Sequence, residues 1–184
     1  MVGVNDSVLK IFDKYYSEIH PAREILITHS RLVRDKCLKI ASNHPELDAD
    51  KQFIAEASLL HDIGIFLTDA PLIGCHGEHP YISHGYLGRE LLEKEGLPKH
   101  GLVCERHTGT GLTVEEIKLQ NLPLPHRDMV PLSIEEQIIC FSDTFYSKGN
   151  DLEKEKSPEE VKKALKKYGD EKVEIFSLWC EMFL

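Results

Sequence analysis

Long apolar segments are missing from this sequence of 184 residues. A helix that crosses a membrane needs roughly 18 to 20 consecutive apolar residues, and no run here approaches that length. The first residues carry Asp6, Lys10 and Asp13, whereas a secretory signal peptide has an apolar stretch there. We therefore expect a cytoplasmic protein that does not contact a membrane.

Close cysteine pairs and an excess of basic residues are missing as well. None of the five cysteines forms a CxxC pair, so we expect reduced, mostly buried thiols rather than a zinc knuckle or a dithiol redox site. The 22 Lys and Arg residues are outnumbered by 31 Asp and Glu residues, which gives a net charge of −9. A protein that binds nucleic acid through many phosphates needs a broad basic surface. This balance excludes that class, but it allows a small anionic substrate that meets local cations.

Strand-like alternation is scarce, and helical patterns dominate the chain. Apolar residues recur three and four positions apart in five segments, which predicts helices over residues 6–18, 22–42, 49–62, 83–95 and 98–106. A serine or threonine followed three residues later by glutamate predicts further helix starts at Thr113, Ser133 and Ser157. We expect a single all-α domain over residues 1–184, a bundle of about seven to nine helices. Residues 151–184 are expected to form two helices on its outside.

Two segments between the expected helices are rich in glycine, proline or histidine. Gly64 is expected to end the helix before it in a left-handed conformation. Residues 66–83 predict a long functional loop, and residues 121–131, with three prolines, predict a rigid extended connection. Near the C-terminus, Trp179, Phe183 and Leu184 are expected to pack in the core or against a second copy of the chain in a homodimer.

Histidine is unusually frequent, with ten residues that all lie between positions 20 and 126. Four of them and two aspartates occupy inward-facing positions on the expected helices or at their ends: His29, His61, Asp62, His84, His107 and Asp143. A single inward histidine is usually a hydrogen-bonded core residue. Burying Asp62 and Asp143 without a cation, however, costs several kcal/mol each. The six groups together therefore predict a shared neutraliser, which two divalent metal ions in a bundle core would supply.

The order of these residues resembles that of a known family. His29, then the string His-Asp-Ile-Gly at residues 61–64, then Asp143 resembles the HD superfamily of metal-dependent phosphohydrolases, and the string itself resembles its HDIG branch. The resemblance covers about residues 26–146, and it implies the helical HD fold for this metal-binding core.

Two further histidines extend the resemblance. His84 with Gly88 four residues later, and His107 before a glycine-rich turn, resemble the six-ligand, two-metal group that includes bacterial symmetric dinucleoside tetraphosphate hydrolases. Residues 107–143 are similar to a small, uncharacterised group of prokaryotic HDIG proteins. Carried over position by position, the resemblance implies one metal ion bound by His29, His61 and Asp143, a second bound by His84 and His107, and Asp62 bridging both.

The ligand types agree with this implication. Imidazole and carboxylate groups without thiolate suit two divalent transition metal ions, Fe or Mn in the first place, with Zn, Co or Ni as alternatives. A hydroxide shared by two such ions is a nucleophile at neutral pH, and the ions can polarise a phosphoryl group. We therefore predict a phosphohydrolase that cleaves an ester or anhydride of a nucleotide or other small phosphorylated molecule, with Asp62 as a catalytic residue.

Two other functions remain open. Some relatives with the same ligand set are mixed-valence di-iron oxygenases, which cleave bonds of an organic substrate with dioxygen. A metal-dependent binding or signalling module without catalysis is the third alternative. Phosphate release from nucleotides would separate the hydrolase from the other two, and oxygen uptake would identify the oxygenase.

The contact with the substrate anion departs from the family pattern. Many HDIG hydrolases continue with a lysine, whereas Ile65 and Phe66 stand there in this sequence. The anion must then be met elsewhere, and Arg127 is the first candidate because a guanidinium pairs with phosphate oxygens. A solvated surface arginine is the competing interpretation.

Other substrate contacts are expected near the metal ligands. Thr108 directly follows His107 and would add a hydroxyl donor. One of the loop histidines, His76 or His79, with His79 as the first candidate, would protonate the leaving group, because a histidine pKa of about 6.5 suits that task. Together with Arg127, the loop at residues 74–83 is expected to form the substrate mouth above the metal ligands.

Overall fold

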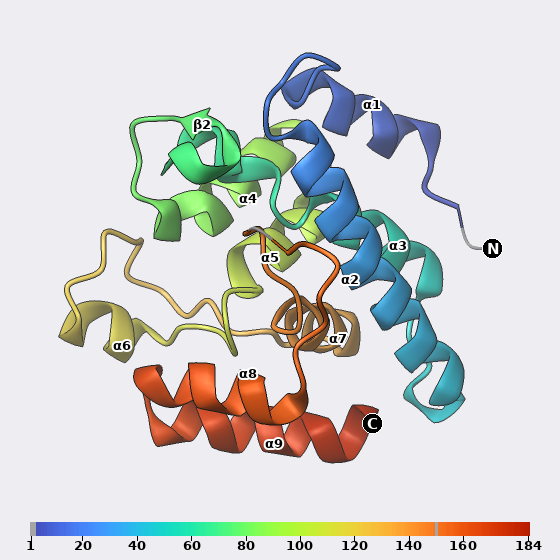
Figure 1. The fold of residues 1–184 in the computed structure, drawn as a ribbon, viewed down its shortest axis with the longest axis vertical. Coiled ribbons are helices and arrows are strands. Elements are labelled where there is room, and N and C mark those ends of the chain that lie inside the picture. Colours follow the sequence, from blue (N-terminus) through green and yellow to red (C-terminus); the bar gives the residue numbers. More distant parts are fainter. Residues whose placement is uncertain (1–2, 150) are drawn as a thin grey trace.

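The computed structural model describes residues 3–149 and 151–184. Within these ranges the chain forms nine α-helices and one small sheet, which confirms the expected all-α bundle (Figure 1). The helices are α1 (Asp6–Tyr15), α2 (Arg23–Asn43), α3 (Lys51–Leu60), α4 (His84–Lys94), α5 (Pro98–Arg106), α6 (Val114–Leu119), α7 (Ile134–Asp143), α8 (Pro158–Leu165) and α9 (Asp170–Phe183). Strands β1 (Asp69–Ala70) and β2 (Cys75–His76) pair antiparallel. No helix in the described ranges is long and apolar enough to cross a membrane.

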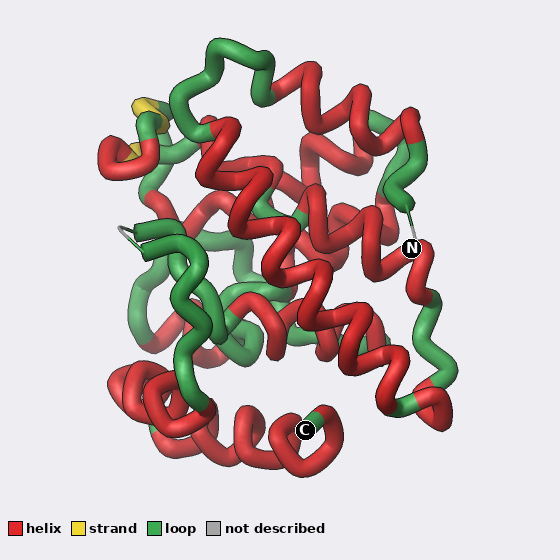
Figure 2. The backbone as a smooth tube through the Cα atoms, turned by 45° about the vertical axis from the view of Figure 1, so that its right-hand side comes forward, coloured by secondary structure: helices red, strands yellow, loops and turns green. Residues whose placement is uncertain are grey.

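The described residues form two large apolar clusters that share helices α2, α3 and α5, and a small third cluster that includes Ile117 of α6. The C-terminal cluster, which includes Val33 and Phe141, joins α2, α3 and α7 to α8 and α9. The N-terminal cluster, which includes Leu26, Leu60 and Leu92, joins α1 and the first half of α2 to α4 and α5. Helix α2 contributes to both clusters and runs along most of the molecule (Figure 2). The parts of α2, α3 and α5 that lie between the two large clusters are therefore fixed by packing on both sides.

Helix α1 ends at Tyr15, earlier than the expected end at residue 18. The next residue, Tyr16, is fully buried. Its hydroxyl donates a hydrogen bond to the carbonyl oxygen of Ile63 (3.2 Å) and accepts one from the backbone N–H of Phe66 (3.0 Å). A ring delivered by the end of α1 thus fixes the backbone directly after Asp62.

The expectation for Gly64 was wrong. Helix α3 ends at Leu60, and Gly64 lies in a 3-10 turn, Ile63–Leu67, without the positive φ of a left-handed cap. A Cβ atom on Gly64 would lie 2.3 Å from the carbonyl oxygen of His84 and 2.6 Å from the backbone nitrogen of Gly88. Glycine is required here because α4 passes directly against the turn.

The segment expected as a long loop, residues 66–83, is more structured than its composition indicated. It contains β1, β2 and short 3-10 turns, and Ile73 and Cys75 are buried in the N-terminal cluster. A hydrogen bond from the backbone N–H of Asp69 to the carbonyl oxygen of His79 (2.8 Å) brings its two sides together. The segment therefore returns to the bundle in a defined position before α4.

Two of the three predicted capping boxes form in full, those that begin at Thr113 and Ser157. At α7 only half of the box forms. The backbone N–H of Glu136 donates to the Ser133 hydroxyl (3.2 Å), but the Glu136 carboxylate pairs with Arg106 (2.9 Å) instead of returning the bond. A long-range ion pair has replaced the local hydrogen bond that would complete the capping box.

Helices α8 and α9 pack together on the outside of the bundle, as expected, and α9 also contacts α7 (Figure 1). The ring of Phe141 on α7 stacks on Phe176 of α9 with 5.2 Å between centroids. Trp179 and Phe183 are buried in the same cluster, which confirms their core role; the homodimer stays a prediction. Lys172 is only 6% exposed, whereas Leu184 is 64% exposed and lies outside the core.

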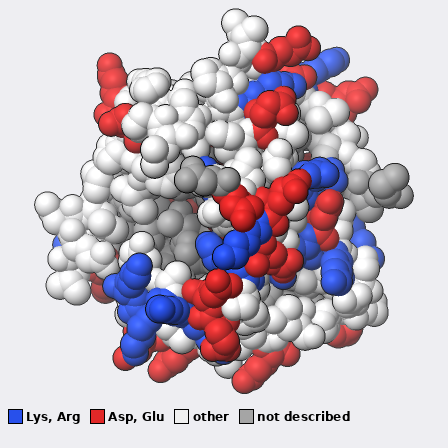
Figure 3. Space-filling view, viewed as in Figure 1, with Lys and Arg blue, Asp and Glu red and all other residues white. Residues whose placement is uncertain are grey.

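The cysteines and the surface charges agree with the composition. All five cysteines are free thiols, and four of them are buried. On the described part of the face shown in Figure 3, Lys and Arg side chains are interspersed with Asp and Glu. That face therefore presents no broad basic area to a nucleic acid.

Candidate metal centre

Six polar side chains from five helices or their ends meet between the two apolar clusters. His29 lies within α2, His61 and Asp62 follow α3, His84 begins α4, His107 follows α5, and Asp143 ends α7. Five of them are buried, and Asp143 is half-buried. The helix ends deliver these groups to a part of the bundle that solvent barely reaches.

The first group of donor atoms surrounds one oxygen of Asp62. Its Oδ2 atom lies 3.0 Å from Nε2 of His61 and 3.4 Å from Nε2 of His29. Oδ1 of Asp143 lies 2.8 Å from the same His29 nitrogen. The ligand atoms of His29, His61 and Asp143 all fall within 4.8 Å of one another, a spacing that fits donors about 2 Å from a common ion.

The second group faces the other oxygen of Asp62. Oδ1 lies 3.6 Å from Nε2 of His84 and 3.5 Å from Nε2 of His107. These two nitrogens are 3.1 Å apart. Asp62 therefore meets each group with a different oxygen, an arrangement that suits a carboxylate between two cations.

Three histidine rings are oriented by hydrogen bonds of one kind. The Nδ1 atoms of His61, His84 and His107 each lie 2.7 Å from the carbonyl oxygen three residues earlier in the chain, those of Ser58, Tyr81 and Cys104. Because a carbonyl only accepts, Nδ1 carries the proton in each ring. The Nε2 atoms then point into the site as potential ligands, an arrangement that proteins use to orient metal-binding histidines.

The polar atoms of the site call for a cation. Asp62 is 2% exposed, and within the described residues neither of its oxygens accepts a hydrogen bond of normal geometry. A buried carboxylate in this state is costly unless a positive charge compensates it. The donor set of imidazole and carboxylate groups fits divalent transition metal ions.

The pKa values of the site residues also show that the buried carboxylates need positive charge nearby. Burial alone would raise the pKa of Asp62, but His61 and the ammonium of Lys148 hold it well below its usual range. Burial would lower the pKa of His61, yet the carboxylates of Asp62 and Asp143 outweigh it and raise this pKa to about 10. Burial and the neighbouring His107 lower the pKa of His84 to about 4. Without metal, a proton on His61 thus supplies part of the missing positive charge.

Sequence reasoning missed Lys148, which lies on the segment that rises across the bundle after α7 (Figures 1 and 2). Its Nζ atom is 2.7 Å from Oδ2 of Asp62 and 3.9 Å from Oδ1 of Asp143. One signal could have found it, since two buried aspartates need cations and this lysine stands five residues after one of them.

The structure gives Arg127 a different partner from the expected phosphate. Its Nε atom donates a hydrogen bond to Oε1 of Glu105 (2.8 Å), and Arg89 pairs with the other oxygen of that carboxylate. Glu105 is buried on α5. Arg127 therefore neutralises a buried charge, and its contact with substrate stays a prediction.

Two cavities border the metal centre. The Lys148 cavity, of about 390 Å³, is lined by residues 69–73, Tyr81 and Lys148. Tyr81 comes from the expected mouth and lies beside His84, with 4.8 Å between ring centroids. The Thr108 cavity, of about 250 Å³, contains Thr108 in its wall. His79 is exposed, and its role as a proton donor stays a prediction.

Comparison with known families gives one match that covers the site. The HD domain family matches residues 26–147, which include all six of the side chains described above. No solved structure matches the chain.

Several curated proteins are similar to parts of the chain, including two tRNA methyltransferases and one uncharacterised protein. The tRNA (cytidine(56)-2'-O)-methyltransferase of Picrophilus torridus is 34% identical over 127 residues, 68% of this chain and 33% of that protein. The protein of the same name from Thermoplasma volcanium is 29% identical with the same coverage. An uncharacterised protein of Methanocaldococcus jannaschii is 36% identical over 107 residues, 58% of this chain and 56% of that protein. The similarity thus spans a third of the methyltransferases and just over half of the third relative.

Proposed function

The chain belongs to the HD domain family, and from that premise we propose that it is a metal-dependent phosphohydrolase. Its proposed substrate is an ester or anhydride of a nucleotide or another small phosphorylated molecule. One observation carries the proposal: the buried carboxylate of Asp62 presents one oxygen to His29 and His61 and the other to His84 and His107.

Two divalent ions fit this arrangement. The first would be held by His29, His61 and Asp143, the second by His84 and His107, and both by Asp62. When bound, such ions would lower the pKa of coordinated water and polarise a phosphoryl group, which would accelerate hydrolysis at neutral pH. The carbonyl groups that fix the Nδ1 protons hold three of the imidazole rings ready for this task.

Lys148 is the proposed contact for a phosphate oxygen. Its ammonium and a metal ion compete for the same oxygen of Asp62, so metal binding frees the lysine. The side chain already lines the Lys148 cavity, where an ammonium attracts an anion. Lys148 would thereby supply the cation that is absent after Gly64. Arg127 is less available, because it is already paired with Glu105.

Substrate would approach through the Lys148 cavity. Tyr81 stands at its border, and the ring partly covers His84. The deeper side chains, including His29 and His61, are fully buried, so bulk water is kept from one side of the site. A small phosphorylated molecule fits an opening of this size better than a polymer does.

The activity named for two relatives is not part of the proposal. The similarity covers only 33% of either tRNA methyltransferase. The six side chains of the site are also groups that bind metal ions, and methyl transfer does not call for such a set.

Phosphate release tests the proposal. Protein purified without chelators is supplied with Mn²⁺ or Fe²⁺ and offered nucleoside phosphates and dinucleoside polyphosphates. We expect metal-dependent phosphate release that the Asp62→Asn variant loses. As a matched control, Asp35→Asn changes an exposed carboxylate on α2 and should leave the rate unchanged.

Two outcomes would contradict the proposed phosphohydrolase activity. Oxygen uptake coupled to loss of an organic substrate, without phosphate release, would establish the di-iron oxygenase instead. Stoichiometric metal binding without turnover of any phosphorylated compound or any oxygen uptake would establish the binding module.

A further inference from the structure

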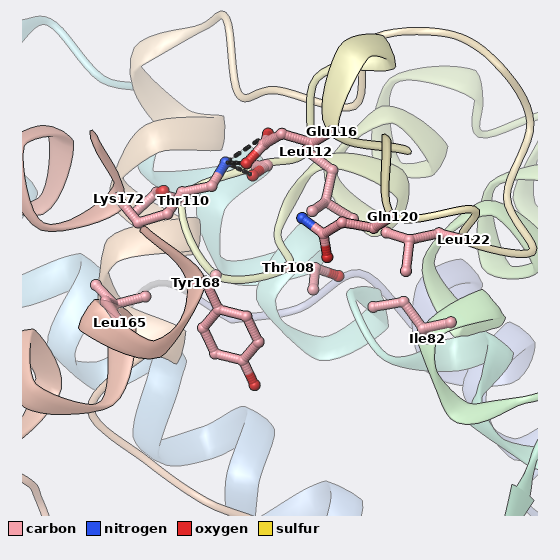
Figure 4. A pocket seen from close by; sticks show the side chains of 12 residues that line it. Ile82, Thr108, Thr110, Leu112, Glu116, Gln120, Leu122, Leu165, Tyr168 and Lys172 are labelled. Carbon is pink, nitrogen blue, oxygen red and sulfur yellow. Dashed lines mark hydrogen bonds and ion pairs between the residues drawn. The ribbon is translucent and has the colours of Figure 1, made fainter. Parts of the chain in front are cut away.

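The wall of the Thr108 cavity includes residues that lie close in the chain to the second pair of histidines. Thr108 in its wall directly follows His107, and Ile82 in its wall precedes His84 by two residues. The opposite wall comes from the C-terminal hairpin, through Leu165, Tyr168 and Lys172 (Figure 4). The cavity is therefore closed by α8 and α9 on one side, and the rest of its wall includes residues that lie close in the chain to His84 and His107.

An ion pair holds one end of this cavity in shape. The ammonium of Lys172 donates hydrogen bonds to the carbonyl oxygen of Gly111 (2.8 Å) and to the carboxylate of Glu116 (2.7 Å). Figure 4 shows this pair at the edge of the cavity. Lys172 is the one cation in the described lining, and its charge is already compensated. The cavity is thus not built for a phosphate group.

The walls are mostly apolar. Leucine and isoleucine side chains line it, those of Ile82, Leu112, Leu122 and Leu165, and the ring of Tyr168 stands at the rim, 68% exposed. A sugar would leave most of its hydroxyl groups without partners against such walls. A flat ring would bury its faces against them and could stack on Tyr168.

A few polar groups interrupt these walls. The hydroxyl of Thr110, a residue only 3% exposed, has no hydrogen-bond partner among the described residues. A buried polar group in this state costs free energy until something bonds to it. In Figure 4 the Gln120 amide is directed towards Thr108 in the middle of the cavity. These groups can bond to the polar edge of a ring whose faces meet the apolar walls.

We propose that the Thr108 cavity binds a heteroaromatic ring of the nucleobase type, the organic half of the substrate whose phosphate is held at the metal centre. The connection between the ring and a phosphate group at the metal centre rests on the proposed function. Binding of the ring in the cavity does not require metal. The Thr110 hydroxyl and the Gln120 amide contact the ring edge, and Tyr168 stacks on its face.

Binding of nucleosides to the chelated protein tests this inference without any catalytic step. Adenosine, guanosine, cytidine and uridine are titrated by calorimetry, with ribose as the probe that lacks a base. We expect at least one nucleoside to bind and ribose not to bind. Tyr168→Ala, at an exposed position where the fold tolerates change, should weaken binding by about five- to tenfold, as loss of a stacking partner does.

Thr110→Val gives a readout that a structural role alone would not produce. Removing a buried hydroxyl without a partner should leave the thermal midpoint of the free protein equal or higher, while nucleoside affinity falls by about tenfold. Leu119→Ala is the matched control, because Leu119 is 88% exposed on α6 and lies outside the cavity. It should bind nucleosides as the wild type does.

The outcomes separate the two proposals. If no nucleoside binds, or if Tyr168→Ala and Thr110→Val bind like the wild type, the inference is overturned whatever the phosphate assay shows. If nucleosides bind with the expected losses but no phosphorylated compound is hydrolysed, the base site stands and the hydrolase does not.

Discussion

The ammonium nitrogen of Lys148 lies 2.7 Å from Oδ2 of Asp62, the carboxylate oxygen that also faces His29 and His61. Buried charges this close stabilise each other, and removing one leaves the other uncompensated. The lysine therefore stands in for a cation in the metal-free protein. A metal ion that binds the same oxygen would compete with it.

Lys148→Met should consequently strengthen metal binding. Without the competing ammonium, the affinity for Mn²⁺ is expected to rise by about tenfold, because no buried ion pair then competes with the metal ion. The chelated variant should unfold at a lower temperature than chelated wild type, because Asp62 has lost its partner. Calorimetric titration and thermal unfolding measure the two effects. Lys163→Met, which changes an exposed lysine on α8, should produce neither.

The same variant should hydrolyse substrate less well although it binds metal better. Loss of the phosphate contact is expected to lower kcat/KM by about 1.5 to 3 kcal/mol. Lys148→Arg keeps the charge and should recover part of the rate. Equal kcat/KM for wild type and Lys148→Met would remove the lysine from the substrate site.

Gly64→Ala should disturb the turn that holds Asp62. Its new methyl group would meet the carbonyl oxygen of His84 at 2.3 Å, so α4 or the turn has to move. We expect a loss of about 1 to 3 kcal/mol in the free energy of unfolding, together with weaker metal binding. Gly3→Ala is the control, since nothing lies within 4 Å of the added atom, and denaturant unfolding should leave it unchanged.

Arg127→Ala separates two roles for this residue. If its pairing with the buried Glu105 is its main contribution, the variant loses about 1 kcal/mol of stability, with Arg89 still in place. KM for the phosphorylated substrate then stays as in wild type. A rise in KM without loss of stability would instead support the phosphate contact that the sequence predicted.

The pair of Glu116 and Lys172 should make stability depend on pH. Burial would raise the pKa of Glu116, but Lys172 and the backbone of Thr113 hold it below its ordinary value of 4.5. A lowered pKa in the folded state stabilises the fold above the unfolded value, and this contribution is lost as pH falls through the folded value.

Glu116→Gln should therefore be less stable than wild type at pH 7, and the difference should shrink below pH 4.5. Thermal unfolding across this range measures it. Glu115→Gln, at the exposed neighbouring position, should follow the wild type throughout. A stability difference that stays constant with pH would show that the ionisation of Glu116 is not its cause.

Local patterns predicted the helices that carry the site. The apolar stripe of α2 correctly placed Leu26, His29 and Val33 inward, because burial follows helical periodicity. Helix α5 has the expected bounds, with Pro98 at its start.

Hydrophobic periodicity could not predict the contacts between segments that are distant in the sequence. Lys148 lies in a loop, where a charged residue usually faces solvent, and its partner is set by tertiary structure. The need for glycine at residue 64 comes from the passage of α4, which no local pattern records. Arg127 and Glu105 pair for the same kind of reason.

The donor atoms of His61 and Asp143 come from chain segments that belong to different apolar clusters. Leu60, directly before His61, packs in the N-terminal cluster, and Phe141 on α7 packs in the C-terminal cluster. The two clusters share α2, α3 and α5, but the elements outside these shared helices can still open locally. An ion held by residues next to both clusters would oppose such opening. Metal loading should then decide whether the protein melts as one cooperative unit or as two, which the ratio of calorimetric to van't Hoff enthalpy reports directly.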